Sequence, residues 1–294
     1  MTSLAVKALV LTGYGINCDL ETQYVFRAAG AEAERVHINR LIEMGRQGRG
    51  LPDYHILALP GGFSWGDDHG AGVLLGLKLR AHLGGQIEEF IAAGKLVIGI
   101  CNGFQALVNT GLLPGFEGGR GQRLVALLAN DYGNFRNQWV HLTIDPKTKC
   151  VFTRGLTHID LPVRHGEGKF YAPDEVIAGL RNSGQVVLRF SAPAVVRKGD
   201  AFNPPGVYEY ESARGRFPYN PNGSLDDIAG ICDATGRVFG LMPHPEAFYR
   251  LTNHPDWTRR LDQARRWNRP QPDWEGDGLK IFRNAVEYVE RNLL

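Results

Sequence analysis

The sequence predicts a single α/β domain built around a parallel sheet that is covered by helices on both faces. In the first third of the chain, short apolar runs alternate with segments of helical spacing, and such runs are typical of strands buried on both faces. The 294 residues, 43% hydrophobic and 22% charged, suffice for one large core. From about residue 115 to 233, strand-like runs lie among Gly, Pro and Asn, which favours an antiparallel elaboration over a second domain.

Five segments predict the parallel part of the sheet. In chain order they are strand 6–12, helix 21–34, strand 54–60, helix 83–95 and strand 95–100. Gly94 marks the C-terminal end of the second helix. Because strands that alternate with helices are joined by crossover connections, this order predicts parallel pairing.

The remainder of the chain adds strands and a final helix. Strand-like runs occupy 139–144, 186–190, 228–233 and 237–243. Apolar residues recur at helical spacing in 278–294 and predict an amphipathic helix. These residues are Leu279, Phe282, Ala285, Val286 and Val289.

The composition argues against several classes of protein. Four cysteines without a CxxC pair disfavour a disulfide scaffold and a structural zinc site. The net charge of +2 gives no reason to expect nucleic-acid binding. No apolar run has the length of a membrane span, and the N-terminus lacks a basic leader and a cleavage site. We therefore expect a cytoplasmic protein that binds neither nucleic acid nor membrane.

Cys101 stands at a predicted strand-to-helix turn, in the run Gly99-Ile100-Cys101-Asn102-Gly103. This run fits the pattern G-x-nucleophile-x-G, in which small residues flank the turn that raises the nucleophile above the sheet. The N-terminus of the following helix also stabilises negative charge on sulfur. The alternatives are an ordinary buried cysteine and an Asn-Gly hairpin, and the helical spacing of the next residues argues against the hairpin.

His244 and Glu246 supply a candidate base and the group that orients it. They follow the predicted strand 237–243, whose end would lie at the same sheet edge as Cys101. Prolines on both sides of His244 restrict the backbone, and an extended geometry would place both side chains on one side. Two rivals stay open: the pair in His165-Gly166-Glu167, and the thiol of Cys18.

Glycines at the end of strand 54–60 suggest an oxyanion hole. The backbone N–H groups of Gly62 and Asn102 could face a developing negative charge, although a plain glycine turn is the alternative. The nearby Asp67-Asp68-His69 resembles a metal cluster. Since it lacks further ligands at a defined spacing, we read it as a solvated loop and expect no metal site.

Six stretches occur in a fixed order: PGGFSWGD, GICNGFQ, HGEGKF, YNPNGS, DIAGI and GLMPHPE. Together they resemble the glutaminase subunits of phosphoribosylformylglycinamidine synthase, which are class I (triad) glutamine amidotransferases. The resemblance covers residues 5–247 and resumes at DGLKIF. It implies a flavodoxin-like three-layer sandwich with a mostly parallel central sheet and antiparallel elaborations, in one glutamine amidotransferase domain over 1–294.

The resemblance also implies the role of each site residue. Cys101 would attack the carboxamide of L-glutamine, and His244, oriented by Glu246, would pass a proton to the leaving ammonia. Gly62 and Asn102 would stabilise the oxyanion, and water would hydrolyse the glutamyl thioester. Four side chains would line the glutamine pocket: Gln105, Phe63, Asn130 and Phe135.

The chain lacks a GxxxxGK[ST] phosphate loop, so the sequence gives it no evident ATP site. The resemblance implies two partners, a large ATP-dependent synthetase subunit and a small accessory subunit. ATP and Mg²⁺ would bind to the synthetase, with no cofactor on this chain. The complex would convert formylglycinamide ribonucleotide to formylglycinamidine ribonucleotide in purine biosynthesis, and ammonia would pass through a protected channel.

The chain departs from the family pattern at Ala247, Tyr132 and Gln138, and in an insertion at about 249–276. Between 250 and 269 the insertion carries six arginines against two aspartates, together with Trp257 and Trp267. This composition suggests a docking surface for the synthetase, and a solvated helix that packs onto the domain is the alternative. Two other functions stay open: an amidotransferase that serves a different synthetase, and a non-catalytic glutamine-sensing subunit.

Overall fold

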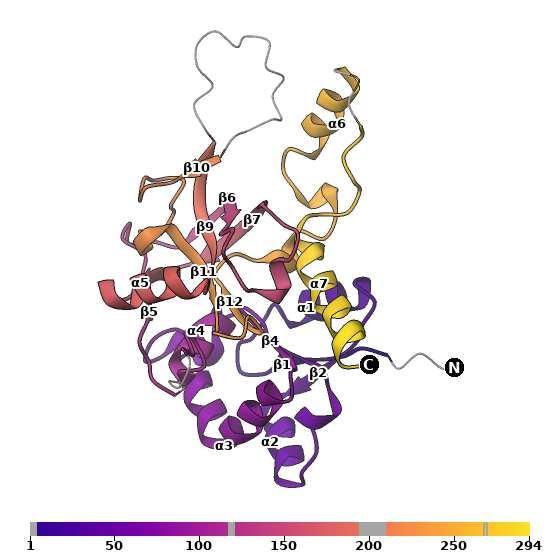
Figure 1. Cartoon of the computed structure of the whole chain (residues 1–294), viewed down its shortest axis with the longest axis vertical. Coiled ribbons are helices and arrows are strands. Elements are labelled where there is room, and N and C mark those ends of the chain that lie inside the picture. The colour runs from indigo at the N-terminus through magenta and orange to yellow at the C-terminus, as the bar shows by residue number, and fades with distance from the viewer. Residues whose placement is uncertain (1–4, 117–120, 194–209, 267, 269) are drawn as a thin grey trace.

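The computed structural model describes residues 5–116, 121–193, 210–266, 268 and 270–294, and it shows an α/β architecture around one large sheet (Figure 1). The strands follow the order β2-β1-β3-β4-β12-β11-β9-β6-β7, and β10 pairs with β9. The predicted parallel sheet with an antiparallel elaboration is therefore confirmed.

The parallel half of the sheet carries the functional edge. It consists of β1 (Lys7–Thr12), β2 (Glu32–His37), β3 (Ile56–Leu59), β4 (Leu96–Ile100) and β12 (Val238–Leu241). Every residue of β3, β4 and β12 is buried, as their continuous apolar sequences predicted. Because β12 runs parallel to β4, both strands end at the same edge.

The antiparallel half continues the same sheet. It consists of β6 (Arg136–Ile144), β7 (His158–His165), β9 (Val186–Pro193), β10 (Tyr210–Ser212) and β11 (Ile228–Cys232). A separate two-stranded antiparallel sheet is formed by β5 (Ala126–Ala129) and β8 (Glu167–Tyr171). Buried side chains from both halves belong to one hydrophobic core.

Helices cover the parallel half in two groups. In Figure 1, α1 (Asp19–Ala28) and α7 (Gly278–Asn292) lie together on one side, and α2 (Ile38–Arg46), α3 (Val73–Ala92) and α4 (Asn102–Thr110) lie on the other. The helix α5 (Asp174–Ser183) belongs to the antiparallel half. Short 3₁₀ turns are η1 (Leu51–Asp53), η2 (Ser64–Asp67), η3 (Val151–Thr153), η4 (Leu225–Asp227), η5 (Pro245–Ala247) and η6 (Leu251–Asn253). None of the described helices combines the length and apolarity needed to cross a bilayer.

The predicted helix 21–34 was wrong at its C-terminal end. The helix α1 stops at Ala28, the chain turns at Gly30 with φ of 102°, and Glu32–His37 forms the edge strand β2. An edge strand exposes most of its side chains, so β2 lacks the apolar signature of the inner strands. The helix predicted at 83–95 begins earlier, at Val73.

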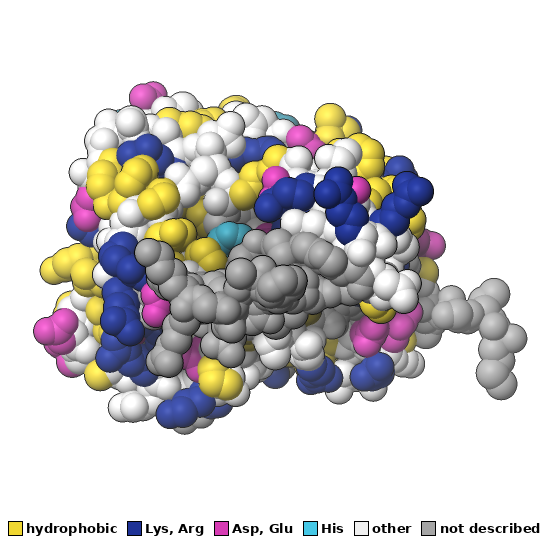
Figure 2. Space-filling model, turned by 90° about the horizontal axis from the view of Figure 1, so that it is seen from above, with side chains coloured by type: hydrophobic (Ala, Val, Ile, Leu, Met, Phe, Trp, Pro, Cys, Tyr) yellow, Lys and Arg dark blue, Asp and Glu magenta, His cyan; other side chains and the backbone are white. Residues whose placement is uncertain are grey.

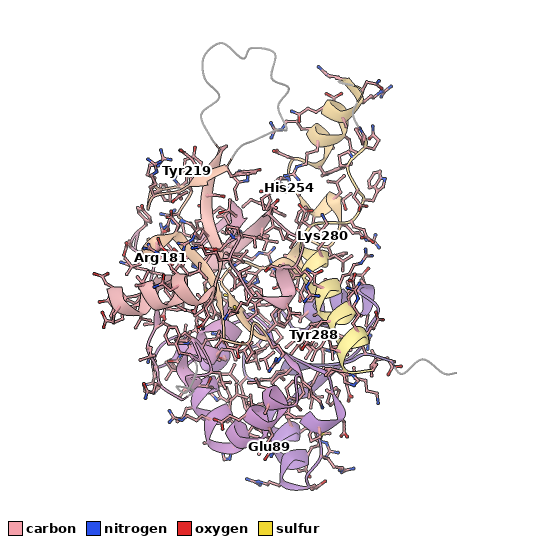
Figure 3. The ribbon with its side chains drawn as sticks, in the orientation of Figure 1. Glu89, Arg181, Tyr219, His254, Lys280 and Tyr288 are labelled. Atoms are coloured by element: carbon pink, nitrogen blue, oxygen red, sulfur yellow. The ribbon has the colours of Figure 1, made fainter. Side chains whose placement is uncertain are left out.

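The segment predicted to be an insertion contains the helix α6 (Trp257–Arg266), which extends away from the body in Figure 1. His254, labelled in Figure 3, lies where this segment meets the body. Its ring packs against that of Trp139, with ring centroids 4.4 Å apart. Arg260 reaches back from α6 and donates a hydrogen bond of 2.7 Å to Asp160 of β7. Trp267 and Arg269 lie outside the described residues. The insertion is therefore anchored at its base by buried side chains.

Candidate active site

Cys101 occupies a strained turn between β4 and α4. Its φ of 50° and ψ of −106° are rare for a residue with a side chain, and its N–H donates a 2.8 Å hydrogen bond to Leu241 O. A Cβ atom on Gly103 would lie 1.9 Å from Leu59 O, and one on Gly99 would lie 2.6 Å from a Leu107 methyl carbon. The glycines on both sides of Cys101 are therefore required by close packing, as the predicted elbow demands.

His244 and Glu246 lie next to each other beyond the end of β12. The two atoms His244 Nδ1 and Glu246 Oε1 are 2.6 Å apart, and both side chains are 2% exposed. The N–H of His244 donates to Pro162 O, which fixes the segment to β7. The predicted extended geometry was wrong, because Glu246 lies in the 3₁₀ turn η5. The turn nevertheless brings the two side chains together.

The pKa of His244 reflects three neighbours. Burial lowers it, but the Glu246 carboxylate and the thiols of Cys101 and Cys18 outweigh burial and raise the pKa well above its usual value. Among the described residues, His244 Nε2 and Glu246 Oε2 have no hydrogen-bond partner. The imidazolium form is therefore favoured, and one ring nitrogen is left free for another group.

The glycine loop after β3 is held against the start of α4 by the Asn102 side chain. Asn102 Oδ1 accepts from the Ser64 N–H at 3.3 Å, and its Nδ2 donates to Asp67 at 3.0 Å and to Gln105 at 3.2 Å. The Asn102 N–H is the first of α4, so the helix gives it no acceptor. The Gly62 N–H donates no hydrogen bond within the described part of the chain. Neither predicted oxyanion donor, the N–H of Gly62 or the N–H of Asn102, therefore donates a hydrogen bond within the described part of the chain.

The four predicted pocket residues fall into two groups. Gln105 and Asn130 are buried, and their side-chain amides form hydrogen bonds within the protein. Gln105 donates to Glu167 O at 2.5 Å, and Asn130 donates to His165 O at 2.8 Å. Phe63 and Phe135 are 45% and 50% exposed, with ring centroids 6.2 Å apart. The structure therefore places the aromatic pair at the surface and the two amides in the supporting framework.

The rival pair, His165 and Glu167, does not form an acid–base unit. Burial, with a smaller contribution from His244, lowers the pKa of His165 to about 3, so this imidazole is neutral at physiological pH. Its Nδ1 lies 3.1 Å from Asn130 Oδ1, while Glu167 accepts from the Ala71 N–H on the other side. His165 is therefore part of a structural network.

Two family stretches, HGEGKF and YNPNGS, meet in that network. Asn222 donates a hydrogen bond to Gly168 O at 2.9 Å, and Ser224 Oγ accepts from the Phe170 N–H at 2.9 Å. A Cβ on Gly168 would lie 2.4 Å from the His165 ring. These two motifs therefore form a hydrogen-bonded framework around His165.

Two features of the site differ from what the sequence analysis assigned: Cys18, which it named only as a rival nucleophile, and Asp67. Cys18 lies beside the pair His244 and Glu246, with one donor atom of each residue within 4.8 Å of the other two. Its place after β1, at the same sheet edge as Cys101, was the available signal. Asp67 was wrongly assigned to a solvated loop: it binds Asn102, and burial followed by the charge of Glu167 raises its pKa to about 6.

The comparisons with known proteins agree with this geometry. The family model for the CobB/CobQ-like glutamine amidotransferase domain matches residues 5–289. A phosphoribosylformylglycinamidine synthase subunit PurQ of Methanococcus maripaludis is 40% identical over 291 residues, which cover 99% of this chain and 100% of the relative. The PurQ of Dehalococcoides mccartyi is 44% identical over 286 residues, covering 97% and 98%. The chain belongs to the PurQ family of glutamine amidotransferases.

Similarity to the PurQ family extends to the fold. A chain from the structure of PurLQS of Thermotoga maritima superposes with a TM-score of 0.65 at 28% identity, covering 97% of this chain and 100% of that one. The resemblance stated from the motifs and the class I amidotransferase fold are thereby confirmed. The roles of the individual site residues stay predictions.

Proposed function

We propose that this chain is the glutaminase subunit of phosphoribosylformylglycinamidine synthase and hydrolyses L-glutamine to glutamate and ammonia. The observation that carries the proposal is the buried pair His244–Glu246 beside the thiol of Cys101, at one sheet edge of a PurQ-family chain. A thiol, an imidazole and a carboxylate are the groups that nucleophilic hydrolysis of an amide requires.

The reaction begins when the Cys101 sulfur, whose proton passes to His244, attacks the side-chain carbonyl carbon of glutamine. The carbonyl oxygen becomes negatively charged, and the uncommitted N–H groups of Gly62 and Asn102 are its proposed donors. The imidazolium of His244 gives its proton to the amide nitrogen, and ammonia leaves. Its raised pKa keeps the proton available for this step.

The second half of the cycle restores the thiol. Water attacks the glutamyl thioester on Cys101, His244 takes the proton of that water, and glutamate leaves as the carbon–sulfur bond breaks. Glu246 orients the imidazole through Nδ1 and stabilises its positive charge. Phe63 and Phe135 are proposed to line the entrance of the glutamine pocket. Gln105 and Asn130 are proposed to set the shape of the pocket through their hydrogen bonds to the backbone.

We propose the same partners for this chain that its structural relative has. That relative is a chain of a PurLQS complex, so a large synthetase subunit and a small accessory subunit are expected here. Because hydrolysis needs only the groups described, no cofactor is assigned to this chain, and ATP and Mg²⁺ are assigned to the synthetase. A thiol nucleophile requires a reducing compartment, so we place the reaction in the cytoplasm.

Reconstitution with the synthetase tests this function. The complex should form formylglycinamidine ribonucleotide with glutamine or with ammonium as nitrogen donor. A Cys101→Ala complex should lose the glutamine-supported reaction and keep the ammonia-supported one. Glutamine-supported turnover in that variant would contradict the proposal. Glutamine binding without hydrolysis in the wild-type complex would favour a sensing subunit instead.

A further inference from the structure

We propose that Cys18, His244 and Glu246 form an inhibitory binding site for a thiophilic divalent cation, with Zn²⁺ as the expected ion. One donor atom from each residue lies within 4.8 Å of the other two, and the set offers sulfur, nitrogen and oxygen. Zinc binds these three donor types at about 2.0–2.3 Å, which puts donors about 3.5 Å apart. The three side chains need only a small inward movement to close on an ion.

The donors are placed by rigid backbone. The Cys18 N–H donates to Gly61 O at 3.1 Å, and Cys18 O accepts from the first turn of α1 through Thr22. The Cys18 sulfur lies 3.4 Å from the position that a Cβ on Gly61 would take, and a ring carbon of His244 lies 2.8 Å from it. Only a glycine at position 61 therefore lets the thiol and the imidazole face each other.

Two buried polar atoms in this cluster have no hydrogen-bond partner among the described residues. They are His244 Nε2 and Glu246 Oε2, on side chains that are each only 2% exposed. Buried polar groups without partners are rare because desolvation is costly. Hydrolysis accounts for one of them, since His244 must exchange protons there, but it gives no role to Cys18.

The local charge also suits a cation. Glu246 and Glu21 place negative charge near the Cys18 sulfur, and His244 places positive charge there only while it is protonated. Cys18 is partly exposed, so an ion can reach its sulfur from solvent. On binding, the Cys18 thiol and the imidazolium of His244 each release a proton to solvent, and the thiolate and the neutral ring become ligands.

Binding would block hydrolysis whichever ring nitrogen coordinates the ion. Through Nδ1 the metal replaces the hydrogen bond to Glu246, and through Nε2 it occupies the nitrogen that must exchange protons with substrate. The ion is thus an inhibitor rather than a cofactor. This inference departs from our expectation, drawn from the sequence, that the chain holds no metal. Inhibition rests on the proposed function, whereas binding does not.

Binding of the metal alone to the full chain is the test. Titration of wild-type protein with Zn²⁺ against a chromogenic chelator should give one site. Cys18→Ser should weaken that site by more than about 100-fold, since losing even an outer partner of a metal ligand costs about 10–100-fold. Cys101→Ala and the distant Cys150→Ser should keep it. Co²⁺ should give a sulfur-to-metal absorption band in all but the Cys18→Ser protein.

The outcomes separate this proposal from the function. A site lost in Cys101→Ala but kept in Cys18→Ser would assign zinc to the catalytic thiol and overturn the proposal, as would the absence of binding. In the reconstituted complex, chelatable Zn²⁺ should inhibit glutamine-supported but not ammonia-supported turnover, and Cys18→Ser should raise the inhibitory concentration about 100-fold. If zinc binds as described but no glutaminase activity exists, only the proposed function fails.

Discussion

The imidazole of His244 is buried and lies beside one carboxylate and two thiols. Burial alone would make it a weak base, and the pKa is raised only because Glu246 and the two thiols favour the charged ring. Most of this could be predicted from the sequence, because the run Met242–Glu246 follows a buried strand. The contribution of Cys18 could not, since it depends on how closely the loops after β1 and β3 approach.

Replacement of Glu246 by glutamine tests that balance. Glu246→Gln removes the charge that stabilises the imidazolium, so the pKa of His244 falls and the proton is lost at lower pH. We expect the alkaline limb of the kcat/KM profile for glutamine to move to lower pH. At pH about 8 the rate should fall by about 100-fold, at the lower end of the range of general acid–base effects. An unshifted alkaline limb would exclude this role, and ammonia-supported turnover serves as the control.

At the scale of elements, the β4–α4 elbow depends on contacts that leave no room for a methyl group. In Gly103→Ala, the new Cβ would meet Leu59 O at 1.9 Å, and we expect a loss of about 3 kcal/mol in the free energy of unfolding. Gly85→Ala in α3 meets nothing within 4 Å and should instead gain roughly 0.5–1 kcal/mol. Urea unfolding measures both changes, and equal stability of the two variants would refute the packing argument.

The base of the insertion depends on Asp160, which is nearly buried. Although burial raises its pKa, the hydrogen bond and charge of His141 and the charge of Arg260 outweigh this and lower the pKa of Asp160 below its usual value. A lowered carboxyl pKa stabilises the fold above the unfolded-state value and loses that effect as the pH falls through the folded-state value. Asp160→Asn should therefore cost about 1.5–3 kcal/mol at pH 7.

The pH dependence distinguishes this ion network from simple packing. The difference between wild type and Asp160→Asn should shrink as the pH falls below about 4, the unfolded value. Asp262→Asn, which breaks an exposed pair with Arg266, should change stability by less than about 1 kcal/mol. A pH-independent deficit in Asp160→Asn would contradict the electrostatic account.

The elements differ in how far the sequence could predict them. The inner strands β3, β4 and β12 were predicted because both faces are buried and their side chains are continuously apolar. The edge strand β2 was not, since its exposed glutamates resemble the end of a helix. The anchoring of α6 joins Arg260 to Asp160, 100 residues apart, so no local pattern could indicate it.

At the scale of the whole molecule, the insertion extends from the body at the end that Figure 2 shows from above, where Lys and Arg side chains stand near hydrophobic ones. Arg260 is turned inward to Asp160, whereas Arg265 and Arg266 are exposed. One face of α6 is thus anchored to the body through Arg260. The other face, with Arg265 and Arg266, belongs to the predicted docking surface. The docking role stays a prediction, because only a partner can test it.

Charge reversal on the exposed face of α6 provides that test. The double variant Arg265→Glu and Arg266→Glu should bind the synthetase about tenfold more weakly at low salt, mainly through slower association, with a smaller dependence on salt. Arg291→Glu on α7 reverses an equally exposed charge away from the insertion and should bind normally. Equal affinities of the two proteins in surface-binding kinetics would remove the insertion from the interface.

The central claim is that Cys101, and not the neighbouring Cys18, carries the glutamyl group. Mixing the reconstituted complex with isotopically labelled glutamine, quenching in acid and mapping the adduct by peptide mass spectrometry tests it most directly. The account predicts a glutamyl thioester on Cys101 in wild type and in Cys18→Ser, and none in Cys101→Ala. A label on Cys18, or rapid hydrolysis without any label on Cys101, would contradict it.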